Sequence, residues 1–282
     1  MKNKLKKRRL VWLFVIVLFA LLCDSRFHLA CSEYLLEFNN LPAGFDGFRI
    51  VQISDLHMRE YGEGNCRLLE AVKKQDPDII VLTGDLINRK DTSSGIGQPD
   101  MLRPFLEELV KIAPCWFVSG NHEWASGELP RLSDILGELG ITYLKNDYIK
   151  LGSGGDTIIL AGVEDPNGPA DMMTPPELVD ALRADYPDSF VILLGHRNYW
   201  LDIYPDLDVD LIFCGHAHGG ILRLPIVGGV FGTDHTLLPE YTDGVYNEGG
   251  YSLVVSRGLG DSTSMPRLFN RPELVTAVLR CK

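Results

Sequence analysis

Five short segments of this 282-residue chain end on side chains that can bind metal ions. In each, a run of apolar residues is followed by Ser or Gly and then by Asp, Asn or His, and five of the seven histidines fall in these segments. Carboxylates, an amide and imidazoles together suit two borderline cations about 3.5–4 Å apart, with one carboxylate shared between them. The segments are "FRIVQISDLH" (48–57), "DIIVLTGDL" (78–86), "CWFVSGNHE" (115–123), "FVILLGHR" (190–197) and "DLIFCGHAH" (210–218).

The last of these segments carries the strongest local signal, because His216 and His218 lie one residue apart among three glycines. Glycine allows a backbone to approach closely, so both imidazoles can face ions. Asp55 and His57 are also two residues apart, and in extended backbone their Cβ atoms leave the same face roughly 7 Å apart. Each pair alone is compatible with an ordinary turn or cap. The repetition of one pattern in five places favours a common site.

The elements that must position these side chains are predicted to be buried strands. Continuous apolar runs bounded by turn residues are typical of strands covered on both faces. Helical patterns at 65–75, 100–112, 129–140 and 175–186 lie between them, so we expect an α/β domain. Polar residues at the carboxyl ends of strands in open α/β sheets face the ligand crevice. Further strands at 157–165, 228–232, 251–260 and 274–281 suggest a second, more antiparallel sheet within one domain, residues 40–282.

These blocks resemble, in order, the five-block motif of the calcineurin-like metallophosphoesterases. The flanks "GFDGFRIVQISDLH", "GHAHGGILRLP", "SRGLG" and "RLFNRPE" are similar to the bacterial membrane-associated branch that includes the YkuE- and YaeI-type phosphodiesterases. The resemblance implies a four-layer αββα sandwich with two mixed β-sheets, the metallo-dependent phosphatase fold. In this branch a proline often follows "GHR", whereas this chain has Asn198.

The same resemblance implies a dinuclear centre of Mn, Fe or Zn ions and assigns roles to residues. One ion would take Asp55, His57, Asp85 and His218, and the other Asp85, Asn121, His196 and His216. His122 would lie over the phosphate as general acid, with Glu123 orienting it. Arg197 and Asn198 are the candidates for substrate contacts.

The N-terminus has the pattern of a membrane anchor or a secretory signal, residues 1–32. Six Lys or Arg among the first nine residues precede 14 uninterrupted apolar residues, Leu10 to Cys23. A helix of that length covers roughly 21 Å, less than the ~30 Å hydrocarbon core, so an anchor must borrow length from its flanks. No good cleavage site follows, which favours an anchor. The positive-inside bias then predicts a single-pass protein of the cell membrane with an extracytoplasmic domain.

Charge excludes one class of partner. The chain has a formal net charge of -11 although its N-terminus is basic, so the remaining domain is strongly acidic. An acidic domain repels nucleic acid backbones, and no nucleic acid partner is expected.

The expected function is hydrolysis of a phosphate ester, most simply a phosphodiester of a lipid-linked or envelope substrate, by a hydroxide that bridges the two metals. A soluble nucleotide phosphodiesterase or phosphatase is the main alternative. A protein phosphatase and a non-catalytic scaffold on the same fold are the other two, and the scaffold is disfavoured because none of the seven expected ligands is missing.

Overall fold

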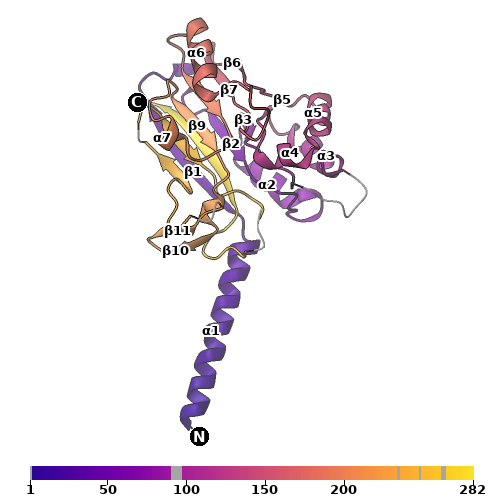
Figure 1. The fold of residues 1–282 in the computed structure, drawn as a ribbon, viewed down its shortest axis with the longest axis vertical. Coiled ribbons are helices and arrows are strands. Elements are labelled where there is room, and N and C mark those ends of the chain that lie inside the picture. Colours follow the sequence, from indigo (N-terminus) through magenta and orange to yellow (C-terminus); the bar gives the residue numbers. More distant parts are fainter. Residues whose placement is uncertain (1, 90–96, 234–235, 248, 262–264) are drawn as a thin grey trace.

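The computed structural model describes residues 2–89, 97–233, 236–247, 249–261 and 265–282. Its first element, α1 (Lys2–Phe27), is a long helix that projects from the domain (Figure 1). Within it, Lys6–Phe27 is long and apolar enough to cross a membrane, judged by length and composition, and almost none of it is covered by the domain. The helix is longer than its 14-residue apolar run because the basic residues before it and the segment up to Phe27 continue the same helix.

The first sheet, sheet A, has the strand order β1-β14-β2-β3-β4-β5. Strands β2 to β5 run parallel to one another, whereas β14 is antiparallel to β2 and parallel to β1. The alternating faces of its central strands are both buried, which explains their continuous apolar sequences. Its strands are β1 (Ala30–Phe38), β2 (Arg49–Ile53), β3 (Ile79–Leu82), β4 (Cys115–Phe117), β5 (Thr142–Tyr143) and β14 (Glu273–Cys281).

The second sheet, sheet B, has the order β12-β13-β9-β8-β7-β6. Its four inner strands are parallel, and the two outer strands pair antiparallel to them. A separate hairpin, β10 with β11, follows β9. The strands are β6 (Asp147–Ser153), β7 (Asp156–Gly162), β8 (Val191–Leu194), β9 (Leu211–Cys214), β10 (Leu222–Leu224), β11 (Gly228–Phe231), β12 (Gly244–Tyr246) and β13 (Ser252–Val255).

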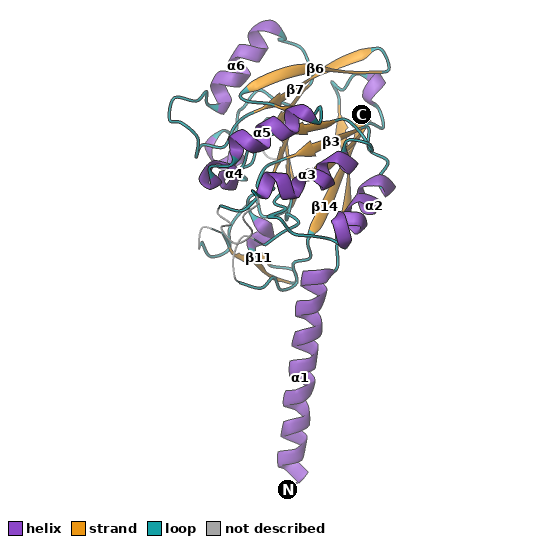
Figure 2. Ribbon diagram, turned by 90° about the vertical axis from the view of Figure 1, so that its right-hand side faces the viewer, coloured by secondary structure: helices purple, strands orange, loops and turns teal. Residues whose placement is uncertain are grey.

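Helices cover the outer face of each sheet (Figure 2). One core joins sheet A to α2, α3 and α5, a second fills the space between the sheets, and a third joins sheet B to α6 and α7. This is the expected four-layer sandwich with two mixed sheets. The helices are α2 (Cys66–Lys74), α3 (Gln98–Leu109), α4 (Asn121–Ser126), α5 (Leu129–Glu138), α6 (Pro175–Asp185) and α7 (Trp200–Ile203), with short 3-10 turns η1 (Ala43–Phe45), η2 (Glu63–Asn65) and η3 (His218–Gly220).

Two expectations about organisation need correction. The domain begins before residue 40, because β1 pairs along its whole length with β14. The strands expected in a separate, more antiparallel sheet are instead divided: 274–281 belongs to sheet A, 157–165 and 251–260 to sheet B, and 228–232 to the hairpin. Hydrophobic patterning identifies a strand but not its partner, so the division of strands between the sheets follows from long-range pairing alone.

Candidate metal centre

The five motif segments meet at one edge of the sandwich, because the strands β2, β3, β4, β8 and β9 all end there. The ligand candidates stand in the loops that follow these strands, except that Asn121 is the first residue of α4 and His218 the first residue of η3. The loops turn sharply, and several non-glycine residues adopt left-handed backbone, which is strained and gathers at functional sites. These residues are Asp55, His57, Asp85, His216 and His218, with φ between 48° and 68°.

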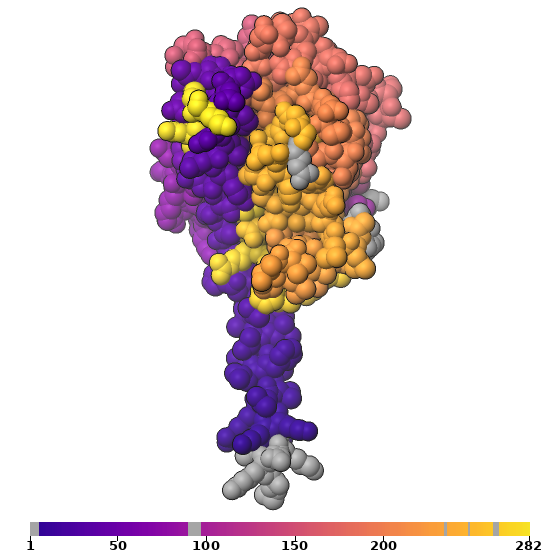
Figure 3. All heavy atoms as spheres, turned by 90° about the vertical axis from the view of Figure 1, so that its left-hand side faces the viewer, coloured from indigo at the N-terminus to yellow at the C-terminus, as the bar shows by residue number. Residues whose placement is uncertain are grey.

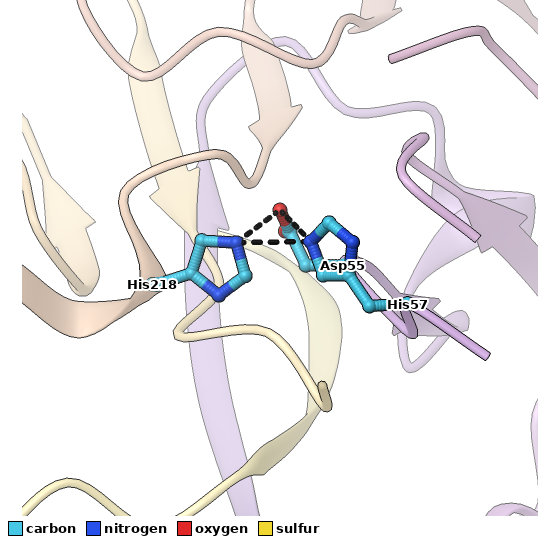
Figure 4. A group of neighbouring side chains, drawn as sticks. All are labelled: Asp55, His57 and His218. Atoms are coloured by element: carbon cyan, nitrogen blue, oxygen red, sulfur yellow. Dashed lines mark hydrogen bonds and ion pairs between the residues drawn. The ribbon is translucent and has the colours of Figure 1, made fainter. Parts of the chain in front are cut away.

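The first cluster consists of Asp55, His57 and His218, whose ligand atoms all lie within 4.8 Å of one another (Figure 4). His218 Nε2 lies 3.2 Å from Asp55 Oδ1 and 3.1 Å from His57 Nε2. The distance from His57 Nε2 to Asp55 Oδ1 is 4.0 Å. All three side chains are buried, so two ring nitrogens and a carboxylate face one another away from bulk water.

The second cluster consists of Asp85, His196 and His216, again with ligand atoms within 4.8 Å. His196 Nε2 lies 3.3 Å from Asp85 Oδ2, and the same carboxylate oxygen lies 3.7 Å from His57 Nε2 of the first cluster. Asp85 therefore stands between the two clusters. His216 and His218 fall in different clusters, in line with what the family resemblance implies.

The donor set fits a pair of cations. Asn121 Oδ1 is buried and has no hydrogen-bond partner among the described residues, and the same holds for His57 Nδ1. An unpaired buried amide oxygen is costly unless a ligand satisfies it. Mixed carboxylate, amide and imidazole donors suit Mn, Fe or Zn better than Ca. The clusters thus fit a dinuclear metal site, in which the expected seven residues would be the ligands.

Burial and the neighbouring charges set the ionisation of these groups. Burial opposes ionisation of Asp55, yet the charge of His218 holds the pKa of Asp55 well below its usual range. For Asp85, burial is likewise outweighed, chiefly by His196, and its pKa is lowered. Burial lowers the pKa of His57 to about 3, whereas Asp85 overcomes burial at His196 and raises its pKa to about 10. The carboxylates are ionised and His57 is neutral, the forms that bind a cation, whereas His196 is protonated next to Asp85 and would have to lose its proton to bind one.

His122 and Glu123 follow Asn121 in α4, and the structure separates their positions. His122 Nε2 lies 3.9 Å from Asp85 Oδ2, and its ring packs edge-on against His57 at 4.5 Å between centroids. It therefore stands at the wall of the site. Its Nδ1 is buried with no partner in the described part of the chain.

Glu123 does not orient His122, which corrects the expectation. Its Oε2 accepts hydrogen bonds from the backbone N–H groups of Asp85 (2.8 Å) and Gly120 (2.7 Å). Its Oε1 accepts from Leu86 (2.7 Å) and Ile87 (3.3 Å). Burial, then the Asp85 charge, raises the pKa of Glu123 to about 7. Its carboxylate thus holds the Asp85 loop against the start of α4, and Glu123 is a positioning residue.

Arg197 lies beside the second cluster. It pairs with the buried Asp165 through two contacts of 2.6 and 2.9 Å, and its Nη1 lies 2.9 Å from His216 Nε2. Asn198 donates to the backbone oxygen of Tyr241 at 3.0 Å. Both residues line a cleft of about 420 Å³ that also reaches His216.

Three residues near the site were not assigned a role from the sequence. Arg267 places Nη2 3.2 Å from His218 Nδ1 and pairs with Asp261 at 2.8 Å. Arg89 places Nε 3.4 Å from His122 Nε2. Arg267 lies in the flank "RLFNRPE", so that motif was the one available signal. Arg89 and Asp261 belong to no pattern in the sequence.

Known proteins resemble this chain over most of its length. The family model described as calcineurin-like phosphoesterase matches residues 48–220, more than half of the chain. The chain is 29% identical over 252 residues to the uncharacterized metallophosphoesterase YkuE of Bacillus subtilis, covering 88% of this chain and 85% of YkuE. It is 28% identical to the phosphodiesterase YaeI of Escherichia coli, with 80% of each chain covered. It is 26% identical to the UDP-2,3-diacylglucosamine pyrophosphatase LpxG of Chlamydia trachomatis, covering 86% and 87%.

The family match spans every strand end that carries a candidate ligand, from Asp55 to His218. The chain therefore belongs to the calcineurin-like phosphoesterases and is a phosphoester hydrolase.

Proposed function

We propose that this hydrolase is anchored by α1 and cleaves a phosphodiester or pyrophosphate bond of a lipid-linked or envelope substrate at the membrane surface. The observation that carries the proposal is the position of the site: it lies at the end of the domain where α1 enters. The basic residues at the beginning of α1 favour an extracytoplasmic domain.

The sheet register supports this placement. Strand β1 begins at Ala30, soon after α1 ends at Phe27. Ala30 pairs with Glu273 at the start of β14, and Val275 pairs with Gln52 near the end of the antiparallel β2. The carboxyl end of β2, which leads into Asp55, is therefore at the same edge of sheet A as the start of β1. Figure 1 shows α1 leaving the domain at that edge.

Side chains connect the end of α1 to the site. Arg26 Nη1 lies 3.8 Å from Asp261 Oδ2, and Asp261 Oδ1 accepts from Arg267 Nε at 2.8 Å. Arg267 in turn contacts His218 of the first cluster. Arg271 also pairs with Asp24 of α1 through contacts of 2.6 and 2.8 Å. A membrane crossed by α1 would therefore lie close to the candidate ligands.

The cleft beside the second cluster also has an apolar side. It extends from His216 and Arg197 to Leu237 and Leu238, both of which are more than half exposed. A phosphate group near His216 would thus have lipid-compatible side chains along one wall of its cleft. A substrate with an apolar portion suits this cleft better than a free nucleotide. The name of the relative LpxG, a UDP-2,3-diacylglucosamine pyrophosphatase, combines the same two features, a pyrophosphate and acyl groups.

The residues of the chain divide the chemistry among them. When bound, two cations would neutralise phosphoryl charge and lower the pKa of a water molecule. His122, at the wall of the site, would give its proton to the leaving oxygen, a contribution of roughly 10²–10⁴-fold in rate. Arg197, held rigid by Asp165, would bind a phosphoryl oxygen. Glu123 would keep Asp85 in place.

The test uses the purified full chain in detergent, loaded with Mn and checked for metal content. Hydrolysis of an artificial aryl phosphodiester reports phosphoesterase chemistry. A panel of lipid phosphodiesters and lipid pyrophosphates against cyclic and linear nucleotides then reports the substrate class. We expect higher kcat/KM on the lipid panel and no activity in Asp85→Asn. Preference for nucleotides would refute the lipid substrate, and an inert, metal-free protein would refute catalysis altogether.

A further inference from the structure

Exposed apolar side chains gather around the β10–β11 hairpin. Outside α1, most of the large apolar residues that are strongly exposed lie in three short segments, 224–227, 237–238 and 265–269. We call these segments the apolar face. Its members are Leu224, Ile226, Val227, Leu237, Leu238, Met265 and Phe269.

The three segments form one continuous surface, because backbone pairing joins them. Leu224 pairs with Gly228 within the hairpin, and Leu222 of β10 forms a bridge with Leu268. On the other side of the hairpin, Phe231 of β11 bridges to Leu237, and Leu238 donates to the Val230 oxygen at 2.9 Å. Exposed apolar patches of this kind mark interaction surfaces in soluble domains.

The tip of the hairpin adds a second observation. Ile226 is completely exposed and adopts φ 73°, the left-handed backbone that β-branched residues strongly disfavour. Neither exposure nor strain stabilises the folded domain, and Asn or Gly would fit this turn better. Contact between this isoleucine and an apolar medium outside the domain would account for its presence at the tip.

The position and charge of the apolar face identify that medium. Figure 1 places β10 and β11 at the end of the domain where α1 enters, Figure 2 shows β11 at the same end, and Figure 3 shows the orange surface of this region just above α1. The chain from Leu224 to Thr233 contains no charged residue. Arg223 pairs with Asp243 at 2.6 Å and Arg271 with Asp24, while Glu240, two residues from Leu238, is exposed. The surface thus offers apolar contact and few free charges.

We infer that the apolar face inserts into the same bilayer that α1 crosses, with Ile226 and Val227 at its deepest point. This inference rests on the anchoring proposed above. Insertion would give the domain a second attachment and fix the orientation of the cleft, whose wall includes Leu237 and Leu238 of the same face. A lipid-linked phosphate could then enter the cleft without leaving the membrane surface.

The first experiment measures insertion without relying on catalysis. The full chain carrying Ile226→Trp is reconstituted into phosphatidylcholine vesicles with or without bromine on the acyl chains, because bromine quenches nearby indoles. The control is Ile203→Trp, since Ile203 is also exposed but lies on α7, outside the apolar face. We expect the added fluorescence to shift to the blue and to be quenched only at position 226. Equal quenching at both positions, or none at 226, as for a protein-docking surface, would overturn the inference.

The lipid head group supplies another arm of the same experiment. Because the apolar face has few free charges, quenching at 226 should be the same in phosphatidylcholine and phosphatidylglycerol vesicles and should not change with salt. Quenching that requires anionic lipid would show attraction by charge and contradict apolar insertion.

A second experiment connects the surface to the reaction. Ile226→Asn removes the apolar group and relieves the strained backbone, so loss of folding is not expected. We expect kcat/KM for a lipid phosphodiester in vesicles to fall about tenfold, the loss expected for one buried side chain. Hydrolysis of a soluble aryl phosphodiester, and both activities of Ile203→Asn, should stay unchanged. An equal loss on both substrates would contradict the inference, whereas absence of all hydrolysis in the parent would refute the proposed function and leave the quenching result standing.

Discussion

Replacement of Glu123 by Gln tests how the site is held together. The structure gives the Glu123 carboxylate four backbone donors, two on each oxygen. A glutamine keeps one oxygen and replaces the other with an amide NH2 group, so two backbone N–H groups must face another donor. Both oxygens are fully buried, and water cannot replace the lost acceptor.

The cost follows from these contacts. A buried donor left without an acceptor costs about 1–3 kcal/mol, so two of them lower the free energy of unfolding by about 2–6 kcal/mol. The displaced loops carry Asp85 and Asn121, and loss of such support typically weakens metal binding by about 10–100-fold. We therefore expect reduced metal content at limiting metal and partial recovery of kcat when metal is in excess.

The matched control is Glu177→Gln. Glu177 occupies the same third position of a capping box, in α6, but it is exposed and water can replace its contacts. Its substitution should change the free energy of unfolding by less than about 1 kcal/mol. Urea unfolding and elemental analysis of both variants decide the question. If Glu123→Gln matched its control in stability and metal affinity while losing only kcat, then Glu123 would act on His122. The conclusion that its carboxylate holds the Asp85 loop against α4 would then be wrong.

Three further substitutions test the centre itself. Asp85→Asn should lower the metal content from about two ions per chain to near zero and abolish hydrolysis, because its carboxylate faces both clusters; retention of two ions by elemental analysis would contradict the shared role. His122→Ala should reduce kcat by about 10²–10⁴-fold with metal content unchanged, and unaltered turnover would exclude it as the acid. Gly215→Ala would place its Cβ against the Asp55 carboxylate and should weaken metal binding by about 10–100-fold. The control Gly137→Ala lies in open space on α5 and should stabilise the fold by about 1 kcal/mol in a urea titration. Equal effects of the two substitutions would refute the argument that the Asp55 carboxylate leaves no room for a side chain at position 215.

Much of the site was predictable from the sequence because each ligand candidate directly follows a buried strand. The apolar runs before Asp55, Asp85 and His216 define strands, and parallel strands bring their carboxyl ends to one edge. Convergence of the five segments therefore follows from local patterns and one rule of architecture. The separation of His216 from His218, by contrast, was implied only by the family resemblance.

The errors arose where local sequence carries no directional information. The family resemblance assigned Glu123 to His122, yet consecutive residues of a helix point in different directions. Three of its four partners are backbone groups of a loop more than thirty residues earlier. Arg267 and His218 are 49 positions apart in the sequence, and only the folded chain brings them together.

The start of the domain was predicted at residue 40, after β1 rather than before it, for a related reason. Strand β1 alternates exposed and buried residues, including Glu33 and Glu37, so it lacks the continuous apolar run of the inner strands. Its pairing with β14 joins residues near opposite ends of the chain. No local pattern predicts that contact.

Strand β14 lies between β1 and β2 in sheet A, and this position determines when the sheet can form during translation. Sheet A stays divided between β1 and β2 until residues 273–281, the last strand of the chain, have been synthesised. At roughly 5–20 residues per second, β1 waits about ten to fifty seconds for its neighbour after leaving the ribosome. The nascent chain must therefore keep an open sheet edge next to α1 until β14 emerges, and truncation within residues 273–281 would leave that edge permanently open to aggregation.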